Sequence, residues 1–540
     1  MKKMMFLIAC VLCTVAGYAQ QGPLATTQYG VLEGVCESGV NVFKGVPFAA
    51  PPVGENRWRA PQPQQPWQGV RSAKKFGDDP MQGNPFGDMG FDAEKKSEDC
   101  LYLNVWTPSK TMTDRLPVVI YFNGGGLIAG SGSEPRYSGR QMARHGIVAV
   151  TANYREGIFG FFAHPQLSKE TSYKGSGNYG FMDQAAAIKW VYENIAAFGG
   201  DPKQITIVGE SAGSMSVSAL LVSPLTRGMI ARAMASSGAV CGRRLLSLKD
   251  AEKQGVQKLK ELGLKNIGDA RKMSADELLA KTLSGGLASY CLDGYFFTED
   301  PTDAYLNGHQ QKVPLLVGRN SLEMSPQAYL GGKAPTLENL RPALEAAFGD
   351  KTDEAMRLYG LNTDRDVLGK PGVDFASDQF IAYGTWLFGY LHAKTSGQPV
   401  YRYCFTRPRP EMRNKDLVAG LAGGVQKKGD DDVMTIPQND EFKGAVHSAD
   451  IEYAMGTLPT NRVYDWQPDD YRVSDQFINY YANFIKTGNP NGLGLANWTS
   501  ITGKEQPTQL ILDVDSYEEY DPAFEQRNLW LMQFNCFGSR

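Results

Sequence analysis

Short apolar runs alternate along the chain with longer segments whose apolar residues recur at helical spacing. Residues 183–197 are such a helical segment, with one apolar face made by Ala187, Ile188, Val191 and Ile195. Strands separated by helices are typical of a mainly parallel sheet that helices cover. The pattern therefore predicts an α/β fold, and the runs that most clearly predict strands are residues 117–122, 147–153, 205–208, 313–318 and 399–405.

Two long segments interrupt this alternation, at residues 239–298 and 324–383. Helical patterns within them, such as 251–262 and 336–348, alternate with loops, so we expect insertions that add helical cover over the sheet. Neither an internal repeat nor a proline- or serine-rich linker divides the sequence. Residues 20–540 are therefore predicted to form a single domain.

The first nineteen residues have the pattern of a signal peptide. Lys2 and Lys3 precede an apolar stretch at 4–16, and Gly17 and Ala19 give a small-x-small cleavage site. The apolar stretch is shorter than a membrane span requires, which disfavours an uncleaved anchor, and the LIAC sequence falls too early for a lipoprotein box. We expect cleavage after Ala19, a secreted or periplasmic protein and no stable membrane insertion afterwards.

Composition and charge narrow the possible partners. The 540 residues carry a formal net charge of −3, which gives no electrostatic reason to expect nucleic acid or an acidic membrane surface as a partner. No histidine and cysteine cluster has metal-ligand spacing, and we expect neither metal nor organic cofactor. The oligomeric state is not predicted.

Export permits disulfides, but sequence cannot choose between pairings and buried free thiols among the six cysteines of the mature chain, Cys36, Cys100, Cys241, Cys291, Cys404 and Cys536.

A G-x-S-x-G motif follows the apolar run at 205–208 directly, in the sequence ITIVGESAGS. A serine on a sharp strand-to-helix turn occupies a strained backbone conformation, and the flanking positions leave space only for glycine. The next residues lack glycine and proline over 215–221, which favours a helix. This context predicts that Ser211 is a nucleophile and that the Ala212 amide faces a developing oxyanion.

Three consecutive glycines follow the predicted strand at 117–122. Because glycines leave their amides unshielded, Gly125 and Gly126 could surround one oxygen together with Ala212. The alternative is a flexible loop. The position directly after a strand, upstream of the serine, favours an oxyanion hole.

The five histidines of the chain are the candidates for the general base that would activate Ser211. In hydrolases of this kind the chain order is nucleophile, acid, histidine, with the histidine after the last main strands. This order leaves His447 after excluding His145, His164, His309 and His392. The acid should follow the strand at 313–318, where Glu323 is the candidate; a surface role for Glu323 and the nearby Asp300 and Asp303 remain alternatives at this point.

With these residues assembled, the sequence resembles the type-B carboxylesterases, the cholinesterase and para-nitrobenzyl esterase group of α/β-hydrolases, along nearly the whole mature chain. The matching passages are FKGVPFAAPPVGENRWRAPQP, SEDCLYLNVW, ANYREGIFGF, FGGDP, GESAG, GAVHSADIEYAMG and ANFIKTGNPNG. The resemblance implies an α/β-hydrolase fold with helical insertions over the active site. It also implies catalytic roles for Ser211, Glu323 and His447, and two buried ion pairs, Arg57 with Glu98 and Arg155 with Asp183.

The sequence departs from the family pattern near the expected site. Asn123 and Leu127 stand where the family usually has a histidine and an aromatic residue around the triple glycine, which puts the shape of the acyl pocket in doubt. Cys100 occupies the place of a loop cysteine, but the expected partner region has none. The acid motif, usually Asp-Glu-Gly, reads Leu322-Glu323-Met324.

The resulting hypothesis is a secreted serine esterase that hydrolyses small or aromatic esters through an acyl-enzyme. One alternative is a catalytically silent adhesion or binding member of the same fold. Another is a lipase acting at an interface, with the apolar stretch at 81–91 as its lid. The glycine-rich stretches at 81–90 and 420–432 are the expected mobile loops. The natural ester is not predicted.

Overall fold

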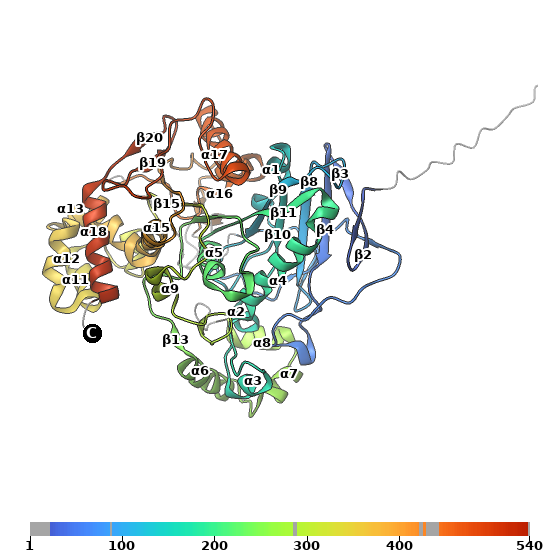
Figure 1. The fold of residues 1–540 in the computed structure, drawn as a ribbon. Helices are drawn as coiled ribbons and strands as arrows, with labels where there is room; N and C mark the ends of the chain where they lie inside the picture. The colour runs from blue at the N-terminus through green and yellow to red at the C-terminus, as the bar shows by residue number, and fades with distance from the viewer. Residues whose placement is uncertain (1–21, 87–88, 284–288, 421–424, 428–441, 538–540) are drawn as a thin grey trace, which may run out of the picture.

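The structure is a computed structural model that describes residues 22–537, apart from 87–88, 284–288, 421–424 and 428–441. The predicted signal peptide therefore lies outside the described residues, as does most of the predicted loop at 420–432. Within the described ranges, one large sheet runs through the molecule with helices on both faces (Figure 1).

The sheet has eleven strands in the order β20-β19-β16-β15-β12-β11-β9-β10-β8-β4-β3. The pairings from β10 through β9, β11, β12, β15 and β16 to β19 are parallel, and antiparallel strands flank this centre on both sides. The mostly parallel, helix-covered sheet predicted from the sequence is confirmed. The strands are β3 (Val35–Glu37), β4 (Val40–Pro47), β8 (Tyr102–Thr107), β9 (Leu116–Phe122), β10 (Val148–Ala152), β11 (Gly200–Glu210), β12 (Arg232–Ser236), β15 (Leu315–Asn320), β16 (Val400–Phe405), β19 (Gln509–Leu512) and β20 (Tyr517–Glu519).

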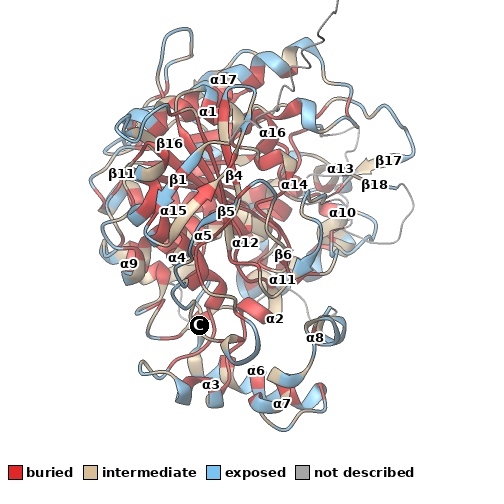
Figure 2. Cartoon of the chain, turned by 90° about the vertical axis from the view of Figure 1, so that its right-hand side faces the viewer, coloured by how far each residue is buried: buried red, intermediate tan, exposed pale blue. Residues whose placement is uncertain are grey.

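Successive side chains of the central strands enter two different cores. In β9, Ile120 and Phe122 pack into one apolar cluster, whereas Val119 and Tyr121 pack into the other. This alternation follows from the pleat of a strand, which points neighbouring side chains to opposite faces. Both clusters are buried, so the centre of the sheet is closed to solvent on both faces (Figure 2).

Long helices cover the two faces. On one face lie α4 (Tyr179–Asn194), α5 (Ala212–Val222) and α15 (Tyr383–Thr395), whose apolar residues belong to the first cluster. On the other face, α16 (Ile451–Met455) and α17 (Pro468–Thr487) contribute to the second cluster. The predicted helix at 183–197 corresponds to the end of α4 and a 3₁₀ turn at Ile195–Phe198. The smaller helices include α1 (Arg140–Arg144), α2 (Gly157–Gly160), α3 (Pro165–Glu170), α9 (Pro301–Asn307) and α18 (Pro522–Met532).

The two insertions differ in where their helices lie. The second carries α10 (Pro326–Tyr329), α11 (Leu337–Phe348), α12 (Thr352–Tyr359), α13 (Asp364–Leu368) and α14 (Lys370–Ser377), and a π-helical turn, η6 (Asp378–Ala382), joins α14 to α15. The first carries α6 (Leu248–Glu261), α7 (Ile267–Lys272) and α8 (Ala275–Thr282), which gather with α3 at one end of the molecule (Figure 1). The predicted helical cover over the active site therefore concerns the helices of the second insertion and not those of the first.

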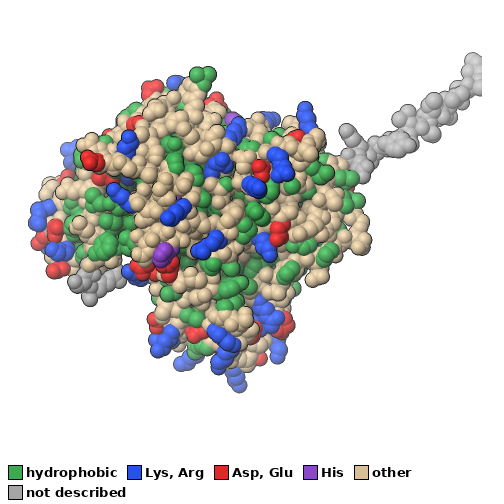
Figure 3. Space-filling view, viewed as in Figure 1, with side chains coloured by type: hydrophobic (Ala, Val, Ile, Leu, Met, Phe, Trp, Pro, Cys, Tyr) green, Lys and Arg blue, Asp and Glu red, His purple; other side chains and the backbone are tan. Residues whose placement is uncertain are grey.

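Three further observations concern the surface charges, the cysteines and the helices of the described residues. Basic and acidic side chains are interspersed on the face drawn in Figure 3. The six cysteines of the described residues are free thiols, four of them buried. Among the described residues, we find no helix with both the length and the apolar character needed to cross a membrane.

Candidate active site

Ser211 lies on a sharp turn between β11 and α5. Its backbone has φ 56° and ψ −122°, and its amide donates to the Ser236 carbonyl at 2.9 Å. The flanking glycines have steric reasons: a Cβ on Gly209 would lie 2.3 Å from the Gly213 backbone, and one on Gly213 would lie 2.1 Å from the Phe122 carbonyl oxygen. The strained conformation presents the Ser211 side chain at the apex of the turn.

Glu323 and His447 lie on two loops that pair with each other. Leu322 and Val446, the residues before them, form an isolated parallel bridge, and the Leu322 amide donates to the Ala445 carbonyl at 2.9 Å. The first loop follows β15 and the second precedes α16. The bridge fixes the glutamate and the histidine in register, although 124 residues separate them in sequence.

The three side chains form one hydrogen-bonded row. His447 Nε2 lies 3.0 Å from Ser211 Oγ, and His447 Nδ1 lies 2.5 Å from Glu323 Oε2. The other Glu323 oxygen accepts from the Asn320 amide and from Ser237 Oγ, both at 2.6 Å. Glu323 is fully buried, so these contacts hold its carboxylate where it can orient the imidazole.

The alternative acids lie in other contacts. Asp300 caps α9 by accepting from the Thr302 amide at 3.0 Å, and Asp303 pairs with Arg244. The structure thus brings Glu323, and neither aspartate, to His447. Of the remaining histidines, His309 pairs with Glu299 at 2.9 Å on the surface.

The predicted oxyanion amides face the same cavity as Ser211. Gly125, Gly126 and Ala212 line it, and their amides donate to no acceptor among the described residues. Gly125 has φ 111° and Gly126 has φ 64°, values that a residue with a side chain adopts only with strain. Three open amides beside a serine are suited to binding a negative oxygen.

Asn123, at the place of the family's usual histidine, stabilises this loop through hydrogen bonds. Its Nδ2 donates to the Gly124 carbonyl at 3.0 Å and to Glu156 Oε1 at 3.2 Å, while Tyr154 donates from its hydroxyl to the Asn123 carbonyl at 2.9 Å. Glu156 is buried, and burial raises its pKa well above the usual range. Its hydrogen bond from Asn123 links the glycine loop to the segment after β10.

Glu210, which the sequence reasoning passed over, contacts the histidine from the serine side. Its Oε1 lies 3.4 Å from His447 Nε2 and accepts from Ser448 Oγ at 2.7 Å. Burial raises the pKa of Glu210 to about 7 against the opposing charge of His447. Burial alone would lower the pKa of His447, but the carboxylates of Glu210 and Glu323 outweigh it and raise that pKa to about 9.

A second unpredicted carboxylate lies behind this row. Asp450 accepts hydrogen bonds from Ser236 Oγ, from Asn320 Nδ2 at 3.0 Å and from the Tyr403 hydroxyl at 3.0 Å. Asn320 also donates its amide to Glu323, so the two acids share a support. Each of the two acids missed in the sequence has a place in the chain that could have drawn attention to it. Glu210 is the variable residue of the serine motif, and Asp450 comes three residues after His447.

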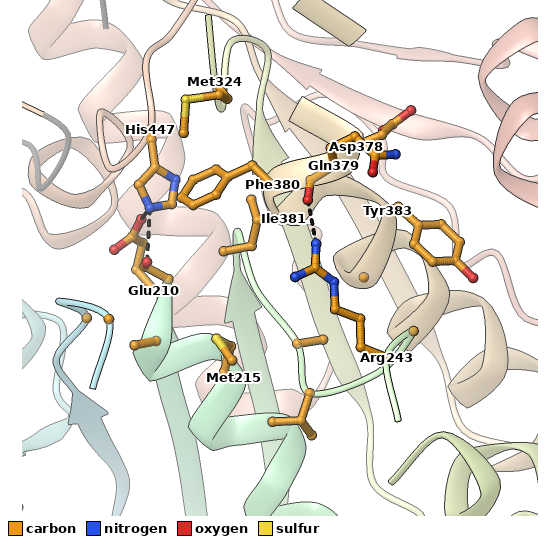
Figure 4. A pocket seen from close by; sticks show the side chains of 18 of the residues that line it. Glu210, Met215, Arg243, Met324, Asp378, Gln379, Phe380, Ile381, Tyr383 and His447 are labelled. Carbon is orange, nitrogen blue, oxygen red and sulfur yellow. Dashed lines mark hydrogen bonds and ion pairs between the residues drawn. The ribbon is translucent and has the colours of Figure 1, made fainter. Parts of the chain in front are cut away.

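The cavity in front of Ser211 has a volume of about 570 Å³ and mostly apolar walls. Met324 and Phe380 lie beside His447, and Phe380 presents its ring edge-on to the imidazole with centroids 5.2 Å apart, while Met215 lies lower in the view (Figure 4). Phe86 and Met89 of the predicted loop at 81–91 also line it. Such a cavity suits a substrate with an apolar body.

Both predicted ion pairs are present. Arg57 Nη2 lies 2.6 Å from Glu98 Oε2, and Arg155 Nε lies 2.8 Å from Asp183 Oδ2. The Arg155 and Asp183 side chains are almost completely buried, so removing one partner would strand the other charge at a cost of about 3–5 kcal/mol.

Comparisons with known proteins agree with this architecture. A model of the carboxylesterase family matches residues 21–524. The fumonisin B1 esterase of Sphingopyxis macrogoltabida is 41% identical over 391 residues, covering 70% of each chain, and the para-nitrobenzyl esterase of Bacillus subtilis (strain 168) is 32% identical over 528 residues, covering 93% of this chain and 97% of that protein. A solved para-nitrobenzyl esterase structure superposes with a TM-score of 0.77 at 29% identity, covering 96% of this chain and 99% of the other.

The sheet order, the covering helices and these likenesses define an α/β-hydrolase fold. The chain belongs to the carboxylesterase family, and it is a carboxylic-ester hydrolase that acts on small ester substrates. The family resemblance inferred from the sequence is confirmed.

Proposed function

We propose that the protein is a secreted serine esterase in which Ser211, His447 and Glu323 form the catalytic triad. The observation that carries the proposal is the continuous row from Ser211 Oγ through both imidazole nitrogens to Glu323, at 3.0 and 2.5 Å. These distances match those of a nucleophile, its general base and the acid that orients the base.

In the first half of the reaction, Ser211 Oγ attacks the ester carbonyl carbon while its proton passes to His447 Nε2. The amides of Gly125, Gly126 and Ala212 donate to the oxyanion. The tetrahedral intermediate then collapses, and the alcohol leaves with the proton from Nε2. The acyl group stays bound to Ser211 as an ester.

In the second half, water attacks the acyl carbon and gives a proton to His447 Nε2. Collapse of the second intermediate breaks the bond to Ser211, which regains the proton as the acid departs. Throughout, Glu323 stabilises the imidazolium without accepting its proton. The sequence of steps requires no other protein group to change its charge.

The test compares wild type and Ser211→Ala, both beginning at Gln20, on para-nitrophenyl esters from acetate to palmitate. We expect turnover by wild type and loss of at least about 10³-fold in the variant, with an unchanged thermal unfolding transition. Ser72→Ala, at an exposed position outside the cavity, is the matched control. Substantial activity in Ser211→Ala would overturn the triad, and silence of wild type on all of these esters would point to a more selective natural ester.

The lipase alternative has one supporting observation, the presence of Phe86 and Met89 in the cavity wall. An interfacial enzyme should gain activity steeply when a long-chain ester passes its solubility limit. A smooth, saturating dependence on substrate, with preference for the shorter esters, would favour the esterase.

We also propose that residues 1–19 direct export and are then removed, on the strength of the signal-peptide pattern at Lys2, Lys3 and Ala19. The intact mass of protein recovered outside the cytoplasm should correspond to a chain beginning at Gln20. A mass that includes Met1 would contradict cleavage.

A further inference from the structure

Four side chains in the cavity wall carry a carboxylate, an imidazole or a guanidinium group: Glu210, His447, Asp378 and Arg243. Glu210 and His447 face each other at 3.4 Å. Asp378 is compensated by Arg527, whose Nε donates to its Oδ2 at 2.7 Å. Arg243 has no carboxylate within ion-pair distance among the described residues. Its positive charge is therefore not paired with any of them.

One hydrogen bond to the described residues holds Arg243 in position. Its Nη2 donates to the Gln379 carbonyl at 2.8 Å, which ties the loop after β12 to the π-helical turn η6. In Figure 4 the guanidinium lies on the far side of Phe380 and Ile381 from His447. A guanidinium has five N–H donors, so one bond to a carbonyl leaves most of them for a ligand.

Arg243 is exposed to solvent at one end of the cavity, where two tyrosines lie within reach of its charge. Tyr290 and Tyr329 line the same end of the cavity, and the charge of Arg243 acts on both: burial raises the pKa of Tyr290 to about 12, and the guanidinium opposes the rise. Arg243 itself is exposed, but the walls between it and Ser211 are mostly apolar, so a substrate spanning them would exclude water from the guanidinium and strengthen the ion pair.

We propose that Arg243 binds a carboxylate carried by the substrate, so that the enzyme prefers esters with a free acid group remote from the scissile bond. The inference rests on the proposed function, because the ester carbonyl must lie at Ser211 while the carboxylate reaches Arg243. The planar guanidinium matches a carboxylate through two parallel hydrogen bonds. The apolar wall holds the carbon chain between the two ends.

The test uses ester pairs that differ only in a carboxylate or a neutral carboxamide. One arm places the group on the acyl side, as mono-para-nitrophenyl esters of adipic and suberic acid against their amides. The other arm places it on the alcohol side, as 4-acetoxybenzoate against 4-acetoxybenzamide. The quantity measured is the ratio of kcat/KM for the acid to that for the amide, with the spontaneous rate subtracted.

For wild type we expect the acid to be preferred in at least one arm. Arg243→Gln should lower that ratio roughly 2- to 10-fold, because a charge-assisted pair at an exposed arginine is lost, and Arg243→Lys should lower it less. Added salt should reduce the wild-type ratio. Arg144→Gln, which removes an exposed arginine outside the cavity, is the matched control.

Two outcomes would overturn the inference: preference of wild type for the amide in both arms, or an Arg243→Gln variant that slows acid and amide equally. An equal loss for acid and amide would mean that Arg243 stabilises η6 and does not bind the substrate carboxylate. Failure of the proposed function is distinguishable, because hydrolysis of the neutral amide esters still depends on Ser211 if the triad is correct.

Discussion

The two sides of the cavity are built differently. On the side of Ser211, the ionisable groups are buried and bonded to one another: Glu323 accepts three hydrogen bonds and Glu210 contacts both His447 and Ser448. On the opposite side, the wall is mostly apolar and comes from the insertions, and Arg243 has one hydrogen bond to the described part of the chain.

The difference separates positioning from recognition. A catalytic group must be held within a fraction of an ångström, which requires several simultaneous hydrogen bonds and burial. A wall that receives a substrate needs shape and a few polar contacts, and it tolerates change. We therefore expect substitutions on the first side to change the rate for every ester, and substitutions on the second to change the choice between esters.

The largest effect should come from Glu323→Gln. The amide nitrogen of glutamine can face His447 Nδ1 and favour the tautomer whose Nε2 carries the proton, which cannot accept one from Ser211. We expect kcat to fall by about 10³- to 10⁴-fold on every ester of the series, with little change in KM. Steady-state kinetics with a circular dichroism spectrum of the folded variant measure this.

The chain offers a matched control in its other glutamate–histidine pair. Glu299→Gln changes the contact with His309, which is partly exposed and remote from the cavity lining. Its kinetics should equal those of wild type. A Glu323→Gln variant that retained a tenth of the wild-type rate would show that the acid has no orienting role.

The comparison also explains how far the sequence could predict the molecule. The five strands inferred from apolar runs all lie in the parallel centre, where burial on both faces forces an apolar sequence. Flanking strands such as β8 were missed because a buried Asn104 interrupts the apolar pattern; its side chain bonds Thr151 and the Gly45 amide. Sequence periodicity does not reveal such tertiary partners.

The site shows the same division. Ser211 could be singled out as a candidate because the turn restricts its neighbours to glycine, and His447 because chain order excluded the others, and the structure brings the two side chains together. The proposed role of Glu323 needed the family resemblance, and the structure brings it to His447. Glu210 could be noticed only as the variable residue of the serine motif, and Arg243 is an exposed arginine like others of the surface; only the folded chain brings these two to the cavity.

An intermediate effect should come from Glu210→Gln, seen in the pH profile. The Glu210 carboxylate favours the imidazolium form of His447, whose pKa is raised to about 9, and only the neutral imidazole can act as base. Removing the carboxylate should therefore lower the pKa of His447 and move the acid limb of kcat/KM to lower pH. The plateau at high pH should fall about tenfold, because the imidazolium of the transition state loses a stabilising charge. An acid limb at the wild-type pH would mean that Glu210 does not act on the base.

The smallest effect should come from Phe380→Ala, at the boundary between the two sides. The ring belongs to η6 of the second insertion, yet it contacts the His447 imidazole edge-on. Such a contact is worth about 0.5–1.5 kcal/mol, so loss of the ring should slow acetate hydrolysis by roughly 2- to 12-fold. The space it leaves should favour bulkier acyl groups, and the ratio of benzoate to acetate hydrolysis should rise. Phe380→Leu, which keeps apolar bulk, should restore most of the wild-type preference. If Phe380→Ala slowed all esters by the factor seen for Glu323→Gln, η6 would belong to the positioning side, and the division between the two sides would fail.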